Sequence, residues 1–402
     1  MYKPRYLDNI IIFTAAFCSL IYIVVSVEVN GYLPAPIFYD KADTFMDFFH
    51  VQYWAYDKGR YTEWQSIYTP FSFWLISFFP YSDNGYEAFI LREEGVFYLI
   101  ILYVITIMLI LYFQSKAIMY SNNIHLIMLL STPFLVTLDR GNLLFITLLF
   151  LLISSLNYKK LWIFSIFMAM AISLKIYLIA LLFIPLLNLH FSRIILTLLL
   201  ALFINLISAN ILGESNWWMF ISNIFEFSSD PRHYEWSYFT YSYQNILLAF
   251  TELNPKYKDI GAWSNILTIL TTFIFFLFVS TKYLLSSLSF RDEERNTLFL
   301  LLAMLIMIVV KNSGGYVFIL LFPFLSSIIF NRISLYILLL LLLPIEIPFM
   351  TLDTITMESF ISGQQVEISR DVTSGMIIRP LLFLILYYMI SINFLYKKRV
   401  HA

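Results

Sequence analysis

The sequence predicts an all-α integral membrane protein with about 12 transmembrane helices (roughly 10–13) and long loops on one side. Composition is the first observation, because 60% of the 402 residues are apolar and only 13% are charged, with a mean hydropathy of +0.79. The second is that apolar runs recur along the whole chain, separated by charged turns. We therefore expect residues 1–402 to form a single polytopic domain rather than a soluble domain with an anchor.

The first apolar segment, 9–27, follows Lys3 and Arg5 and has no small-residue cleavage pattern, so we expect a retained signal anchor. The next eleven segments are expected at 96–113, 124–138, 141–156, 161–173, 176–189, 194–212, 261–280, 297–310, 316–330, 333–350 and 380–396. Segment 141–156 would span only about 24 Å of the roughly 30 Å of hydrocarbon. The turns 139–142 and 173–176 should therefore be sunk in the membrane and line a hollow on the outer side.

Orientation follows from the basic residues. With both termini on the cytoplasmic side, thirteen of the 25 Lys and Arg residues fall on that side: Lys3, Arg5, Lys116, Lys159, Lys160, Arg193, Lys282, Arg291, Arg295, Arg332, Lys397, Lys398 and Arg399. This agrees with the rule that positive loops stay inside. Three long loops, 28–95, 213–260 and 351–379, then lie outside, hold most acidic residues and should carry interfacial helices, one of them within the apolar stretch 67–80.

Several classes of site are disfavoured. A net charge of -1 gives no support for a nucleic-acid partner. The single cysteine, Cys18, excludes an intramolecular disulfide and a cysteine metal site. The five histidines are scattered and the early acids lack ligand spacing, so we expect no metal site and no cofactor, although a divalent ion stays open as an alternative.

Three cations, Arg140, Lys175 and Lys311, fall in very short turns on the predicted outer side. A charge at membrane depth is costly, so each is a candidate ligand for an anion such as a phosphate. Each also has a structural alternative. Arg140 can pair with Asp139, Lys175 can snorkel to the headgroups, and Lys311 can cap the C-terminal end of a helix.

The first outer loop combines carboxylates with aromatic rings, at Asp40, Asp43, Asp47 and Asp57. Rings stack on the apolar faces of sugars, and a carboxylate can remove a hydroxyl proton as general base, so this combination is typical of sugar sites. The alternative is an acidic, solvated loop anchored at the headgroups by Tyr and Trp.

Five segments, taken in this order, resemble the GT-C class of polytopic glycosyltransferases: MDFFHVQYWAYDKGRYTEWQSIYTP, RGNLLFITLLFL, AMAISLKIYLIALLFIPLL, YSYQNILLAF and KNSGGYVFILLFPFL. The chain is similar to the bacterial branch of polyprenyl-phosphomannose-dependent α-mannosyltransferases, and also to phage and bacterial glucosyltransferases that add side branches to O-antigen. Each motif is degenerate, and their order along the chain is the stronger signal.

The resemblance implies a GT-C architecture and inverting transfer of a hexose from a polyprenyl-phosphate donor to a glycan or glycolipid acceptor. Asp47 would be the catalytic base, while Arg140, Lys175 and Lys311 would hold the donor phosphate. Substrate contacts are predicted at Asp43, His50, Tyr53, Tyr68, Asn142, Gln244 and Asn245. The partners would then be the donor, the acceptor and the bilayer, with the site facing the periplasm of a bacterial inner membrane.

Two other classes stay open. A flippase for lipid-linked saccharides would grip a phosphate without chemistry, but it would often show internal repeats, and none is apparent here. An O-antigen polymerase would use arginines in its large outer loops, where this sequence has few. A transferase with a single acceptor fits the sequence better.

Overall fold

The computed structural model describes residues 6–30, 33, 44–79, 89–117, 124–229, 241–243, 246–247, 256, 258–285, 292–309, 315–325, 332–344, 347–358 and 365–396. Its elements are, in chain order, α1 (Tyr6–Asn30), α2 (Met46–Tyr56), α3 (Pro70–Ile76), α4 (Phe89–Ala117), α5 (Ile124–Leu129), α6 (Thr132–Arg140), α7 (Leu144–Leu156), α8 (Leu161–Leu174), η3 (Ile176–Leu182), α9 (Phe183–Leu187), α10 (Phe191–Ile211), η4 (Trp217–Met219), α11 (Phe220–Ser229), α13 (Lys258–Leu285), α14 (Asp292–Val309), η7 (Gly315–Leu321), α15 (Phe322–Leu325), α16 (Arg332–Leu342), β1 (Pro348–Glu358), β2 (Gln365–Thr373) and α17 (Ser374–Tyr396).

Apolar helices dominate the described residues, which confirms a helical membrane protein. Four helical stretches are long and apolar enough to cross a bilayer: Asp8–Val29, Phe191–Ile211, Ala262–Leu285 and Ser374–Tyr396. Six shorter apolar stretches accompany them. The long helix α10 exposes large apolar side chains such as Leu199, Leu202 and Phe203, as a lipid-facing helix does. These helices do not establish the predicted number of about 12 crossings.

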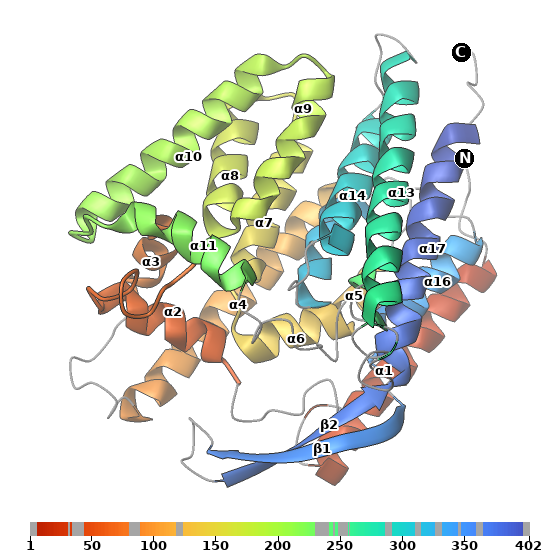
Figure 1. Ribbon diagram of the computed structural model, residues 1–402, viewed down its shortest axis with the longest axis horizontal. Helices are drawn as coiled ribbons and strands as arrows, with labels where there is room; N and C mark the ends of the chain where they lie inside the picture. Colours follow the sequence, from red (N-terminus) through yellow and green to blue (C-terminus); the bar gives the residue numbers. More distant parts are fainter. Residues whose placement is uncertain are drawn as a thin grey trace.

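The centre of the bundle is α7, which packs against α4, α8 and η7. Its residues Leu144, Leu148, Leu151 and Leu152 are all fully buried. A helix that is apolar on every side belongs inside a bundle. Figure 1 shows α7 enclosed by its neighbours, with the β-hairpin and the α2–α3 segment at the end of the molecule opposite α9.

The predicted crossing 124–138 is two short helices, α5 and α6, so this expectation was wrong. Ser131 ends the first by donating to the Met128 carbonyl oxygen (2.6 Å), and its Oγ accepts from the Phe134 backbone N–H (3.4 Å) as the cap of α6. Pro133 then sits in the first turn of α6, where its missing N–H costs nothing. A cap followed by a proline starts a new helix inside an apolar run.

Two further predicted helices are irregular. The segment 176–189 forms the 3₁₀ helix η3 and the short α9, and the segment 316–330 forms η7 and α15 within the residues described. Lys175 has extended backbone angles (φ -138°, ψ 95°), which separate α8 from η3. Both interruptions lie next to the candidate site.

In the predicted outer loop 351–379, the described residues before Ser374 form strands, so the all-α expectation fails there. Strands β1 and β2 pair antiparallel, from Pro348 opposite Thr373 to Glu358 opposite Gln365. The two strands are rich in Thr, Val and Ile, and β-branched residues favour strands. Helix α16 ends at Leu342, short of the predicted 350, and α17 begins at Ser374, ahead of the predicted 380.

Candidate active site

Asp47 lies in the first turn of α2. Two residues just before that turn, Thr44 and Phe45, hydrogen-bond to Asp139 near the end of α6. Phe45, in the left-handed region with φ 62°, donates its backbone N–H to the Asp139 carbonyl oxygen at 2.6 Å. The Thr44 hydroxyl donates to the Asp139 carboxylate at 3.3 Å. The residues just before α2 and the 139–142 turn are therefore joined at the start of the helix that carries Asp47.

Gly141 makes this close approach possible. It ends α6 with φ +66°, a left-handed conformation that residues with a Cβ adopt only at a cost. A Cβ added there would lie 2.9 Å from the Phe48 Cβ and 3.1 Å from the Phe45 Cα. Only glycine lets the turn lie flat against α2.

Asn142 joins the turn directly to Asp47. Its side-chain Nδ2 donates to Asp47 Oδ2 at 2.6 Å, and its Oδ1 accepts from the Leu144 backbone N–H at 3.0 Å, at the start of α7. The amide is 2% exposed, so both contacts are shielded from water. Asn142, predicted to bind substrate, here orients the carboxylate of Asp47.

The environment raises the pKa of Asp47 above its ordinary value. Burial is the largest cause, because it disfavours the charged form. The hydrogen bond from Asn142 and the charges of Lys175 and His50 act in the opposite direction without cancelling the effect of burial. A carboxylate with a raised pKa is a stronger base than an exposed one.

We expect Asn142→Ala to move the acid limb of the pH–activity profile to higher pH. As the predicted general base, Asp47 would have to be ionised to accept a proton, and the variant removes a hydrogen bond that favours the ionised form. The kcat/KM profile of the purified enzyme measures the limb.

Asn142→Asp is the matched comparison, because it keeps an acceptor for the Leu144 N–H but places a second carboxylate beside Asp47. If Asn142 only caps α7, Asn142→Asp should shift the acid limb less than Asn142→Ala. If Asn142 sets the orientation and charge of Asp47, Asn142→Asp should shift the acid limb more.

Lys175 lies between α8 and η3, with its Nζ 4.8 Å from the centroid of the Tyr68 ring. It also interacts electrostatically with Asp47. A cation over an aromatic face is stabilised by the ring quadrupole. These two neighbours favour a place in the site over the snorkelling alternative.

Residues that sequence reasoning missed hold Lys175 and Tyr68 together. The Thr69 hydroxyl donates to the Ser173 carbonyl oxygen at the end of α8. Asn205, on the apolar helix α10, donates to Ser173 Oγ at 2.9 Å and accepts from the Phe71 N–H at 3.2 Å. A buried Asn in a membrane helix was the available signal, since polar groups at that depth usually have a partner.

Aromatic rings extend from the carboxylate along α2. His50 stacks on Trp54 with centroids 5.5 Å apart, and Trp54 lies 6.5 Å from Tyr68. Tyr53 meets Trp64 edge-on at 5.5 Å. The predicted His50 and Tyr68 thus both contact Trp54, while the predicted Tyr53 contacts Trp64. We call these two sets of rings together the aromatic group.

Arg140 is half-buried in the last turn of α6. Tyr316, near the start of η7, interacts electrostatically with both Arg140 and Asp47. Arg140 therefore belongs to the surroundings of the same carboxylate. The predicted site residues Asp43, Lys311, Gln244 and Asn245 lie outside the described residues.

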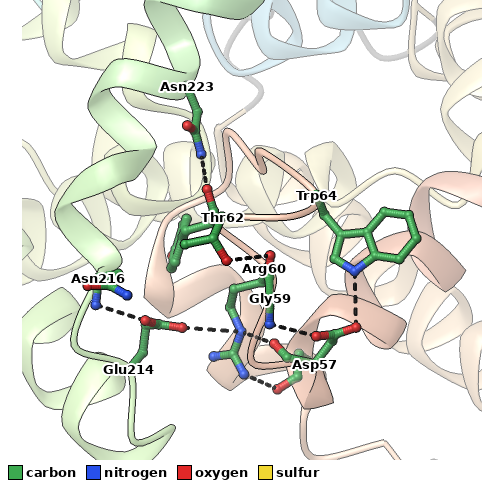
Figure 2. A network of polar contacts seen from close by, with 10 residues as sticks. Asp57, Gly59, Arg60, Thr62, Trp64, Glu214, Asn216 and Asn223 are labelled. Carbon is green, nitrogen blue, oxygen red and sulfur yellow. Dashed lines mark hydrogen bonds and ion pairs between the residues drawn. The ribbon is translucent and has the colours of Figure 1, made fainter.

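A second polar network, also missed from the sequence, connects the segment between α2 and α3 to the residues that follow α10 (Figure 2). The buried Arg60 donates to the carbonyl oxygens of Asp57 (2.8 Å) and Ala55 (3.1 Å). Its Nε also lies 3.8 Å from Glu214 Oε2. Trp64 Nε1 donates to Asp57 Oδ2 at 3.0 Å. This network sets the end of α2 and the position of Trp64.

Among the described residues, no group of three or more His, Cys, Asp or Glu side chains is arranged to hold a metal ion. The described site residues provide a carboxylate, an ammonium, a guanidinium, phenols and aromatic rings.

Comparison with known proteins decides the class. The family model of glycosyltransferase family 87 matches residues 67–311, more than half of the chain. The chain belongs to glycosyltransferase family 87. No curated protein and no solved structure matches it. The family-87 match includes Tyr68, Arg140, Asn142 and Lys175, whereas Asp47 lies before it. Family membership, together with the apolar helices, makes the protein a membrane glycosyltransferase of a GT-C-like class.

Proposed function

We propose that the protein transfers a hexose from a polyprenyl-phosphate donor to a lipid-linked or cell-surface glycan, with inversion at the anomeric carbon. The observation that carries this proposal is the Asp47 carboxylate, held at 2.6 Å by Asn142 with Lys175 as an electrostatic neighbour. A base and a cation side by side are the two groups that such a displacement requires.

In the proposed reaction, an acceptor hydroxyl oxygen attacks the anomeric carbon of the donor, and its proton passes to Asp47. The bond from the anomeric carbon to the phosphate oxygen breaks, and its electron pair stays on the phosphate. Lys175 and Arg140 would stabilise the charge that develops on the leaving phosphate, with Lys311 as a further candidate. The aromatic group of His50, Tyr53, Trp54, Tyr68 and Trp64 would stack on the sugar rings.

We further propose a bacterial inner-membrane location with both termini in the cytoplasm and the site on the periplasmic side. The basic residues favour this orientation. Arg193, at the start of α10, donates to the carbonyl oxygens of Tyr158 and Lys159 in the turn between α7 and α8. Figure 1 shows α9, which precedes α10, at the end of the bundle opposite the β-hairpin. The total of about 12 crossings stays a prediction. The flippase alternative is disfavoured by the family, and the polymerase alternative differs in needing two lipid-linked chains.

The test is a transfer assay with the purified protein in detergent or nanodiscs. Undecaprenyl-phosphate glucose and mannose serve as donors, with UDP-glucose and GDP-mannose as comparison donors, against a panel of lipid-linked glycan acceptors. We expect product only from a polyprenyl-phosphate donor, with the anomeric configuration inverted. Transfer from a nucleotide sugar alone, or retention of configuration, would contradict the proposed donor or mechanism.

A further inference from the structure

A buried hydroxyl beside the phenols of Tyr68 and Tyr316 has no hydrogen-bond partner among the described residues. The Tyr177 hydroxyl oxygen is fully buried and makes no hydrogen bond within the described residues. A buried polar group without a partner destabilises a fold, so it needs an explanation. A ligand that is absent from the structure is one such explanation.

Tyr177 lies where a donor phosphate is expected. It is two residues beyond Lys175, in a turn closed by the Leu178 N–H donating to the Lys175 carbonyl oxygen at 3.0 Å. Its phenol interacts electrostatically with those of Tyr68 and Tyr316. The Lys175 ammonium lies over the Tyr68 ring. The neighbours of the hydroxyl, Tyr68 and Tyr316, are thus the same phenols that interact with Lys175 and with Arg140.

The chemistry of this setting selects the ligand group. A phenol can donate a hydrogen bond to a phosphate oxygen without adding charge. It can therefore bind an oxygen that the neighbouring cations leave without a hydrogen bond. A sugar hydroxyl would not require the cations at Lys175 and Arg140. The neighbourhood therefore fits an anion better than a neutral acceptor.

We propose that the Tyr177 hydroxyl donates a hydrogen bond to the phosphate of the polyprenyl-phosphate donor, beside Lys175. This inference rests on the proposed function and adds a binding residue to it. Tyr177 stays protonated throughout, because Asp47 takes the acceptor proton and the phosphate keeps the electron pair of the broken bond. Its effect is on the binding of the donor and of the departing phosphate.

Tyr177→Phe tests the inference, because it removes one oxygen atom and keeps the ring. Without ligand, the variant is expected to melt at the same temperature as the wild type or higher, since an unpartnered buried hydroxyl is lost. Undecaprenyl phosphate is expected to raise the Tm of the wild type more than that of the variant. The difference should correspond to about 10- to 100-fold weaker binding, the loss typical of a hydrogen bond to a charged group.

Tyr61→Phe is the matched control. The Tyr61 hydroxyl is also buried without a partner among the described residues, but its electrostatic neighbours are Arg60 and Glu214 rather than the site. We expect this variant to keep the full response to undecaprenyl phosphate. Undecaprenol, which lacks the phosphate, should act equally on all three proteins.

Two outcomes separate this inference from the function on which it rests. Equal responses of the wild type and Tyr177→Phe to undecaprenyl phosphate would overturn the role of Tyr177 and leave the proposed donor intact. A wild type that undecaprenyl phosphate does not stabilise, and that transfers no sugar from undecaprenyl-phosphate glucose or mannose, would overturn the donor class and the role of Tyr177 with it.

Discussion

Replacing Asp47 by Asn is expected to abolish sugar transfer while the fold persists. Asn cannot accept a proton, and loss of a general base typically costs about 10²- to 10⁴-fold in rate. Its side-chain oxygen can still accept from Asn142 Nδ2, so the contact between α2 and the 139–142 turn survives. The variant therefore separates the two roles of Asp47, as a base and as a structural acceptor.

Stability should move in the opposite direction to activity. Because the folded-state pKa of Asp47 is raised, the folded protein binds more protons than the unfolded chain between the two pKa values, and stability falls as pH rises through that window. At neutral pH the ionised carboxylate is therefore a destabilising group. We expect Asp47→Asn to show a Tm equal to or above that of the wild type when both are measured at pH 7.

Glu63→Gln provides the control for Asp47→Asn. It makes the same change from acid to amide in the same outer loop, at an exposed position, and it should leave transfer unchanged. The rate of product formation, measured with saturating donor, is the readout. Normal transfer by a well-folded Asp47→Asn protein would remove Asp47 as the base and return the loop to the solvated, headgroup-anchoring alternative.

Replacing Lys175 by Met is expected to reduce kcat/KM for the donor by about 10²- to 10³-fold, the range found when one preorganised group that stabilises developing charge is removed. Met has a similar length and an apolar tip, so it can still pack on the Tyr68 ring, where the ammonium now lies at 4.8 Å. The variant removes the charge and keeps most of the packing. The loss should fall on donor parameters and spare the KM of the acceptor.

Lys58→Met is the matched control, since Lys58 is an exposed cation in the first outer loop. Lys175→Arg adds a second comparison, because it keeps the charge and should retain part of the activity. Steady-state kinetics with donor and acceptor varied separately provide the measurement. If Lys175→Met lowered kcat/KM equally for the donor and the acceptor, or if Lys58→Met lowered the kcat/KM for the donor as much, Lys175 would not be a phosphate ligand.

Sequence reasoning found the membrane class, because that class depends on local composition. Long apolar runs must lie in lipid or in a core wherever the chain folds. A cation such as Lys175 inside such a run is conspicuous for the same reason. The predictions from sequence were wrong in two segments. In 124–138 a capping serine followed by a proline starts a second helix inside the apolar run. In 351–379 a series of β-branched residues favours paired strands.

The partners within the site were beyond the sequence. Asp47 and Asn142 are 95 positions apart, and their contact requires the left-handed Gly141 and the Phe45 turn to coincide in space. Asn205 was equally hidden, since its partners Ser173 and Phe71 lie on other elements. Such contacts depend on the packing of several helices, which no local pattern specifies.

The sequence by itself determined that this chain is a helical membrane protein with costly charges among its apolar segments, because hydropathy and charge act residue by residue. Only the tertiary structure decided that Asp47 is oriented by Asn142, that Lys175 lies over Tyr68, and that the Tyr177 hydroxyl has no hydrogen-bond partner among the residues described. Hydrogen bonds and cation–π contacts act over a few ångströms, so they exist only once distant segments have packed together.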